Sequence, residues 1–476
     1  MTLPAVEPPR DRLAQLLVAS TVGVYLLIAL GVTTALTDAV AACPTWPACA
    51  AGPLAALDDF GLAVTLLHRA TALLVGFGLL ATVAIAWRRR ASRRVRAAVG
   101  VAAVLYPVQV GVGAITAVSG APTAVSSLHL VTAMALFSAL LVAMLWQLEV
   151  AVGSTPDQPA AGDAPPSSIP PAHEPATETG RSSEGLLVRA RETAAAYVVL
   201  TKPKLWWLLT LVALAAMALA AGPALDLGVA VATVVGGVLA IAASGTFNNV
   251  LERDRDRRMA RTSGRPLVRE RIPTRRAVAF GLVLAAGSVA VFLAFVNALA
   301  AALGLLAILF YSVVYTLLLK PHTDQNTVLG GAAGVFPALI GWAAVEETVG
   351  MPALVLGAVV FLWTPAHFYN LALVYRDDYA RAGFPMLPVV RGAATARRHV
   401  TLYLGGTMLA AVALAATTRL DWLYAATAVV VGAVFLWAVV RQHAERTDRA
   451  AGRAFVASNV YLGLLLVAVL VDALAV

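Results

Sequence analysis

The sequence has 476 residues, of which 60% are hydrophobic and only 13% are charged. This composition excludes an ordinary soluble protein. The formal net charge is +9, but the Lys and Arg residues gather in short segments between apolar ones, as they do in membrane proteins. The positive charge therefore does not indicate a nucleic-acid partner, and we predict none.

Apolar segments long enough to cross a bilayer recur along the chain. A hydrocarbon core of ~30 Å needs about 20 helical residues. The segments are apolar all round, which argues against a soluble helical bundle. We therefore predict an all-α polytopic membrane protein with a four-helix N-terminal bundle and a nine-helix bundle after it. The predicted spans are 13–36, 61–87, 97–118, 123–148, 205–222, 225–247, 277–296, 299–319, 326–344, 352–372, 399–417, 421–440 and 456–475.

Four basic segments set the predicted topology. Positively charged loops stay on the cytoplasmic side of a membrane. With all four segments on that side, the chain follows one alternating path through a cell membrane. The N-terminus is then cytoplasmic and the C-terminus outside. The basic segments are residues 88–94, 253–276, 391–398 and 441–453.

The first predicted bundle, residues 1–150, contains a cysteine pair and two intramembrane histidines. Cys43 and Cys49 lie in an outside loop, where a disulfide can persist, but their spacing leaves their oxidation state open. His68 and His129 lie in the second and fourth spans, near the outer end of each. Two such histidines can ligate one haem from facing helices, or they can be structural.

Residues 151–187 divide the chain. Seven prolines precede Gly185, together with Ser, Thr, Asp and Glu residues. Such a segment cannot bury a core, so we predict a disordered cytoplasmic linker. The second module then runs over residues 188–476.

The most informative polar segment follows the second span of this module. If the helix continues, Asn248, Glu252 and Asp256 lie four residues apart on one face. Oxygen ligands of this kind suit Mg²⁺, which also takes waters and substrate phosphates. Neighbouring arginines can hold diphosphate oxygens. An ordinary charged loop is the alternative, but the positive-inside rule does not explain the spaced carboxylates.

A second acidic segment is predicted on the same side of the membrane. It reads Tyr375-Arg376-Asp377-Asp378-Tyr379 and follows the sixth span of the module. By itself it is compatible with a plain loop. Together, two carboxylate segments can clamp one diphosphate through metal ions.

These residues resemble the UbiA-type intramembrane prenyltransferases, and within them the protohaem IX farnesyltransferases (haem O synthases). The first motif is Asn-Asn-x-x-acid-x-x-x-Asp followed by Arg-Thr-x-x-Arg-Pro-Leu. The resemblance covers about residues 195–476. Further matching residues are Thr201-Lys202-Pro203, Lys320 with Asn326, Gly330-Gly331, Gly341-Trp342-Ala343 and Pro385-Met386-Leu387-Pro388.

The resemblance implies Mg²⁺-dependent transfer of a farnesyl group from farnesyl diphosphate to protohaem IX, with the prenyl tail among apolar spans open to membrane lipid. It implies that Mg²⁺ is held by Asn249, Glu252, Asp256 and Asp378, and the helical spacing given above adds Asn248 as a further predicted ligand. The residues expected to stabilise the leaving diphosphate are Lys202, Arg265, Lys320 and Arg376.

His367 lies within the sixth span of this module. An intramembrane histidine is a functional candidate, and we expect this one to contact haem. A histidine hydrogen-bonded between helices is the alternative.

The N-terminal bundle resembles one half of haem A synthase. The resemblance lies in the Cys43-Pro-Thr-Trp46-Pro47-Ala-Cys49 loop and the His68-Arg69 pair. That family usually has Glu where this chain has Thr65, and the second half is absent. These departures favour haem binding, or transfer of haem to the fused module, over oxygenation. Haem A synthase and terminal oxidase assembly factors are the expected partners.

Three other functions stay open. A UbiA relative with another acceptor is opposed by the residue 320–343 and 386–390 motifs. A haem-delivery protein with a degenerate transferase is opposed by the intact Glu252, Asp256 and Asp378. A transporter is opposed because no paired broken helices or inverted repeats are evident.

Overall fold

The computed structural model describes residues 11–37, 39–49, 53–151 and 183–475. Within these ranges the regular structure is entirely helical. Thirteen helical segments are long and apolar enough to cross a membrane, which confirms the predicted spans. Most of the predicted linker lies outside the described residues, and its last residues, from Ser183 on, belong to a helix.

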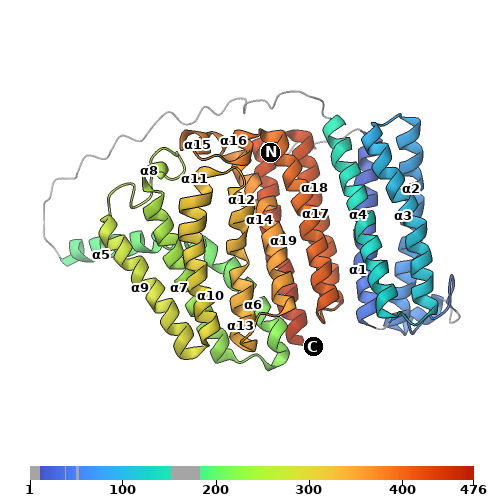
Figure 1. Cartoon of the computed structure of the whole chain (residues 1–476), viewed down its shortest axis with the longest axis horizontal. Helices are drawn as coiled ribbons and strands as arrows, with labels where there is room; N and C mark the ends of the chain where they lie inside the picture. Colours follow the sequence, from blue (N-terminus) through green and yellow to red (C-terminus); the bar gives the residue numbers. More distant parts are fainter. Residues whose placement is uncertain (1–10, 38, 50–52, 152–182, 476) are drawn as a thin grey trace.

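The first four spans form a separate up-and-down bundle (Figure 1). Acidic or hydroxyl side chains cap three of these helices, since Asp11, Asp59 and Ser92 accept hydrogen bonds from first-turn amides. A 3₁₀ turn, η1 (Pro53–Leu57), precedes the second helix. The helices are α1 (Arg12–Leu36), α2 (Phe60–Arg88), α3 (Arg93–Val118) and α4 (Thr123–Ala151).

The second module is a larger bundle preceded by α5 (Ser183–Leu200), which runs crosswise to the spanning helices (Figure 1). Four of its spans are interrupted or flanked by 3₁₀ or π turns. The remaining elements are η2 (Pro203–Leu205), α6 (Trp206–Ala221), η3 (Gly222–Ala224), α7 (Leu227–Leu251), α8 (Arg253–Asp256), α9 (Thr274–Phe295), α10 (Ala298–Leu309), η4 (Phe310–Leu319), α11 (Lys320–His322), α12 (Asn326–Gly330), η5 (Gly331–Gly334), α13 (Phe336–Glu346), α14 (Met351–Val374), α15 (Arg376–Arg381), α16 (Leu387–Val390), α17 (Ala393–Thr417), α18 (Trp422–Glu445) and α19 (Asp448–Ala475).

The two bundles pack directly against each other. Helices α1 and α4 contact α17 and α18, and one apolar core runs through both bundles. Gly405 of α17 lets the bundles approach closely, because a Cβ there would lie 2.1 Å from Cδ2 of Leu141. At one edge Arg398 donates two hydrogen bonds to Glu149, of 2.7 and 2.9 Å. The N-terminal bundle is therefore docked on the larger one.

All four basic segments lie at the same end of the helices, because an even number of spans separates each from the next. The short helices α8, α15 and α16 gather at that end, away from the C-terminus (Figure 1). The two acidic segments found in the sequence therefore meet at one end of the bundle.

Candidate active site and haem site

A buried group of charges lies where α7 ends. Asn248, Glu252 and Asp256 are 1%, 4% and 2% exposed, and each side chain meets a cation from another part of the chain. Lys202 donates to Oδ1 of Asn248. The Nζ atom of Lys320 lies 2.5 Å from Glu252, and Nη1 of Arg265 lies 2.5 Å from Asp256. We call Lys202, Glu252, Asp256, Arg265 and Lys320 the charge cluster.

A strained turn places Lys202. Its φ of +53° lies in the left-handed region, which a non-glycine residue enters at a cost. Gly245 lets α7 approach this turn, because a Cβ there would lie 3.1 Å from the Thr201 carbonyl oxygen. Asn249 donates from Nδ2 to the carbonyls of Leu200 (3.0 Å) and Gly245 (2.8 Å). In this structure Asn249 therefore holds the turn that carries Lys202.

The chain after α8 folds back on Asp256. Thr262 donates to the Asp256 carbonyl at 3.0 Å, while Arg265 pairs with its carboxylate. The spacing of the Arg-Thr-x-x-Arg motif is thus explained by one compact turn around a buried carboxylate.

The charges in the cluster act on one another. Burial lowers the pKa of Lys202 to about 7, although Glu252 acts in the opposite direction. Burial also raises the pKa of Glu252, but Lys320 and Lys202 outweigh it and leave that pKa below its usual value. For Asp256 burial prevails over Arg265 and raises the pKa.

The second acidic segment ties the two loops together. The Asp378 carboxylate accepts hydrogen bonds from the backbone amides of Ala260 (3.3 Å) and Arg261 (3.2 Å), and it pairs with Arg381. Arg376 lies elsewhere: it pairs with Asp377 at 3.7 Å on the surface. The structure therefore brings Lys202, Arg265 and Lys320 to the carboxylates but gives Arg376 and Asp378 other contacts.

The donors of the cluster suit magnesium. Mg²⁺ commonly takes one or two carboxylates and completes its shell with waters and substrate phosphates, and Glu252 and Asp256 provide two carboxylates. Within the described ranges no three His, Cys, Asp or Glu side chains could hold a metal ion by themselves. Asn248, Asn249 and Asp378 make the contacts within the chain described above, and their role as magnesium ligands, like that of the two carboxylates, stays a prediction from the sequence.

In the structure His367 makes the contacts of a histidine that is packed and hydrogen-bonded between helices. Its ring stacks between Trp363 and Phe455, with centroid distances of 4.3 Å to each. Its Nδ1 lies 2.6 Å from Oγ of Ser458 on α19. The contact with haem that the sequence predicts stays a prediction.

Two tyrosines beside the cluster are absent from the sequence prediction. Tyr311 and Tyr315 lie on η4, and Lys202 Nζ stands 5.8 Å from the centroid of the Tyr311 ring. The signal in the sequence is weak, since aromatic residues are common in membrane helices. The one indication in the sequence is that Tyr311 and Tyr315 lie on the span that ends at Lys320.

In the N-terminal bundle, His68 and His129 come from α2 and α4 and lie close enough for their charges to interact. Nδ1 of each imidazole is buried without a hydrogen-bond partner, which is uncommon for a buried polar atom. Glycines face both rings. A Cβ on Gly31 would lie 3.4 Å from Cε1 of His68, and one on Gly113 would lie 2.9 Å from Cε1 of His129.

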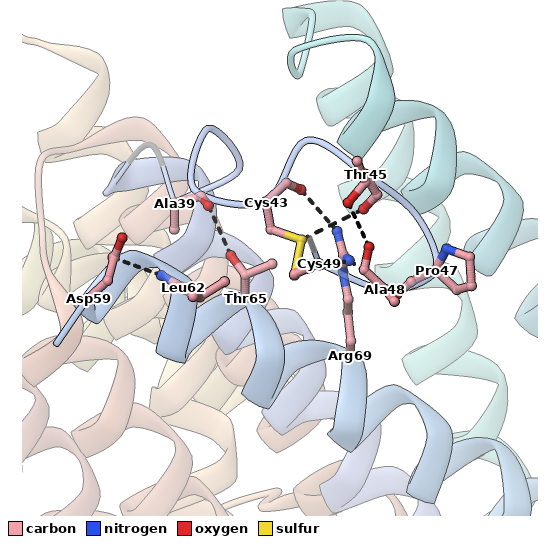
Figure 2. The surroundings of a disulfide bond; sticks show 10 residues. All are labelled: Ala39, Cys43, Thr45, Pro47, Ala48, Cys49, Asp59, Leu62, Thr65 and Arg69. Atoms are coloured by element: carbon pink, nitrogen blue, oxygen red, sulfur yellow. Dashed lines mark hydrogen bonds between the residues drawn. A yellow bond between two sulfur atoms is a disulfide. The ribbon is translucent and has the colours of Figure 1, made fainter. Parts of the chain in front are cut away.

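A disulfide-closed loop covers this end of the bundle (Figure 2). Cys43 and Cys49 are bonded, which answers the question that their spacing left open. Arg69 of α2, next to His68, donates to the carbonyls of Pro47 (3.1 Å) and Cys43 (3.2 Å). Thr65, one turn earlier, donates to the Ala39 carbonyl at 3.0 Å. The loop is thus fastened to α2 on both sides of His68.

Comparison with known proteins matches these two modules to two families. The profile of the UbiA prenyltransferase family matches residues 209–465, which include most of the charge cluster. The profile described as cytochrome oxidase assembly protein matches residues 4–141, which include both histidines. "Protoheme IX farnesyltransferase 1" of Natronomonas pharaonis is 55% identical over 97% of this chain and 98% of its own. The chain belongs to the protohaem IX farnesyltransferases.

Other protohaem IX farnesyltransferases also share both modules. The "Protoheme IX farnesyltransferase" of Haloarcula marismortui is 53% identical over 97% of this chain and 98% of its own. A solved structure of digeranylgeranylglyceryl phosphate synthase aligns with a TM-score of 0.51, covering 60% of this chain and all of the synthase. At 16% identity that likeness shows the fold alone. The chain is a membrane prenyltransferase with an added N-terminal bundle.

Proposed function

We propose that this chain transfers the farnesyl group of farnesyl diphosphate to a vinyl group of protohaem IX and so forms haem O. The names of the relatives support the acceptor and the isoprenoid. The observation that carries the chemistry is the charge cluster, in which three cations and two carboxylates are buried at the end of the apolar bundle. This combination suits a metal-bound diphosphate at the end of a prenyl chain.

The cations bind and orient the leaving group. Lys202, Lys320 and Arg265 hold diphosphate oxygens and stabilise their charge as the C1–O bond of the substrate breaks. Mg²⁺ at Glu252 and Asp256, when bound, supplies further positive charge to the leaving diphosphate. The terminal vinyl carbon of protohaem then bonds to C1, water adds to the resulting cation beside the porphyrin, and a proton is released.

The ion pairs of the cluster explain how these charges stay buried between turnovers. An unpaired buried charge is costly, and here Lys320 neutralises Glu252 while Arg265 neutralises Asp256. Diphosphate and Mg²⁺ bring opposite charges for both sets of groups. When diphosphate and Mg²⁺ bind, each charged side chain therefore exchanges its ion-pair partner in the chain for an opposite charge on the ligand, and no buried charge is left unpaired.

The N-terminal bundle binds haem through His68 and His129. Support comes from their unpartnered Nδ1 atoms and from the two glycines, whose lack of a side chain lets the imidazole rings pack closely against the neighbouring helices. Thr65 is occupied with the Ala39 carbonyl and carries no carboxylate, so we do not assign oxygenation of the porphyrin to this bundle. Haem held by these two imidazoles would supply a redox-active iron to this bundle.

The protein lies in the cell membrane with the charge cluster at the cytoplasmic face. Support comes from the four basic segments at that end of the helices. Haem A synthase and terminal oxidase assembly factors are the expected partners, since residues 4–141 match the profile described as cytochrome oxidase assembly protein.

The test uses membranes that contain the full-length chain. They are incubated with protohaem, farnesyl diphosphate and Mg²⁺, and the extracted haems are separated by chromatography. Haem O should appear only when Mg²⁺ is present. If it does not, while an aromatic acid or a glycerol lipid is prenylated, the acceptor is wrong and the enzyme class is retained.

A further inference from the structure

The span that leads to Lys320 is wound unusually. Over Phe310–Leu319 it forms a π-helix, η4, between α10 and α11. Within it, Thr316 donates from Oγ1 to the carbonyl of Tyr311, five residues earlier, at 2.8 Å. Thr316 also accepts a hydrogen bond from Asn248 Nδ2 at 3.0 Å, so this segment is tied to the end of α7. π-helical turns are rare and often mark functional sites.

The face of the Tyr311 ring is turned toward the charge cluster. Lys202 Nζ stands over it, 5.8 Å from the centroid. Glu252 and Arg265 also lie within electrostatic range of Tyr311. An aromatic face attracts cations in this position, so the ring is placed to interact with positive charge beside the diphosphate groups.

A second ring and a glycine hold Tyr311 in place. The rings of Tyr311 and Tyr315 lie 5.5 Å apart between centroids, tilted by 40°. Tyr315 in turn lies against the backbone of Gly330, where a Cβ would come within 2.5 Å of ring atoms Cδ2 and Cε2. Any side chain at residue 330 would therefore displace Tyr315 and remove the support of Tyr311.

We propose that Tyr311 is a further catalytic residue that stabilises the allylic farnesyl cation with its aromatic face, and that Tyr315 and Gly330 are positioning residues for it. C1 of the farnesyl chain is bonded to a diphosphate oxygen. The positive charge on C1 and C3 therefore develops next to the groups that hold the diphosphate, where the Tyr311 ring lies. A carboxylate at that place would capture the cation, whereas a ring face stabilises it without bonding to it.

This inference rests on the proposed function, and its test separates the two. Full-length variants are assayed in membranes for haem O, with kcat and the KM for farnesyl diphosphate measured separately. Tyr311→Phe keeps the aromatic face and should stay within about twofold of the unchanged protein, while Tyr311→Leu should lose about 30-fold in kcat with little change in KM. Gly330→Ala should also lower kcat.

Phe310→Leu is the matched control, because Phe310 is the neighbouring aromatic residue and packs on Phe336 instead, with centroids 5.8 Å apart. It should leave kcat unchanged. Fluorinated phenylalanines at residue 311 test the electrostatic role of the ring separately from its packing. Each added fluorine weakens the quadrupole of the ring with little change in its shape, so kcat should fall stepwise along the series.

If kcat stays constant along the fluorine series, or if Tyr311→Leu changes only the KM for farnesyl diphosphate, the proposed role of the ring is wrong. The assignment of the chain as a transferase would be unaffected by either result. If the unchanged protein makes no haem O, it is the proposed function that fails.

Discussion

The two polar sites of this molecule are built in opposite ways. In the charge cluster each carboxylate has a cation from the same chain within 2.5 Å. In the N-terminal bundle, Nδ1 of both His68 and His129 is buried without a partner. In the charge cluster each buried carboxylate is offset by a cation of the chain, whereas the open imidazole nitrogens are free to contact a ligand, which we propose to be haem.

The sites also lie at opposite ends of the helices. His68 and His129 are in the second or third turn after α2 and α4 begin, whereas the cluster forms where α7 finishes. Helices α17 and α18 stand between the N-terminal bundle and the rest of the transferase (Figure 1). If the two imidazoles hold haem, as we propose, that haem has to leave them before it meets a farnesyl group at the charge cluster.

The largest effect is expected at Glu252. Glu252→Gln removes a buried charge that we assign to Mg²⁺ and leaves Lys320 without its partner. Haem O formation should fall by at least about 100-fold, since the leaving group loses its charge stabilisation. Glu270→Gln, on the exposed part of the same loop, is the control and should be fully active. Normal turnover in Glu252→Gln would refute the metal assignment.

Replacing both His68 and His129 by Ala should abolish any low-spin haem spectrum of the purified full-length protein. Haem O formation should continue, because the charge cluster is at the other end of the molecule. His322→Ala, at the surface, should leave the spectrum unchanged. A parallel loss of haem O would show that the two sites are coupled.

Asp378→Asn tests whether Asp378 only joins two loops through hydrogen bonds or also binds magnesium. An amide oxygen can still accept from Ala260 or Arg261, but the pairing with Arg381 weakens. We expect a loss of about 1 kcal/mol in the free energy of unfolding. If Asp378 is a magnesium ligand, as the sequence predicts, the Mg²⁺ concentration for half-maximal activity should rise about tenfold. An unchanged concentration would leave Asp378 only the role of joining the two loops.

The smallest effect is expected between the bundles. Glu149→Gln breaks the ion pair with Arg398, whose side chain is 50% exposed. Exposed pairs contribute about 0.5 kcal/mol or less, so thermal unfolding should shift little and the bundles should stay docked through their shared core. Separate unfolding of the two bundles in this variant would contradict that picture.

The sequence alone determined the spans, the shared end of the basic segments and the spacing of Glu252 and Asp256. These features depend on local properties: the length of an apolar run, the positive-inside rule and the helical period. The family motifs also pointed to Lys202, Arg265 and Lys320 as residues of one site, and the structure brings them together there.

Only the tertiary structure decided which groups meet. Lys202 and Asn248 are 46 residues apart in the chain, and Arg261 and Asp378 are 117 apart. Three further roles likewise depend on distant segments. Asn249 holds the turn before α6, Asp378 joins two loops, and Gly330 leaves space for the ring of Tyr315. Periodicity and composition carry no information on such contacts, because they arise when whole helices pack.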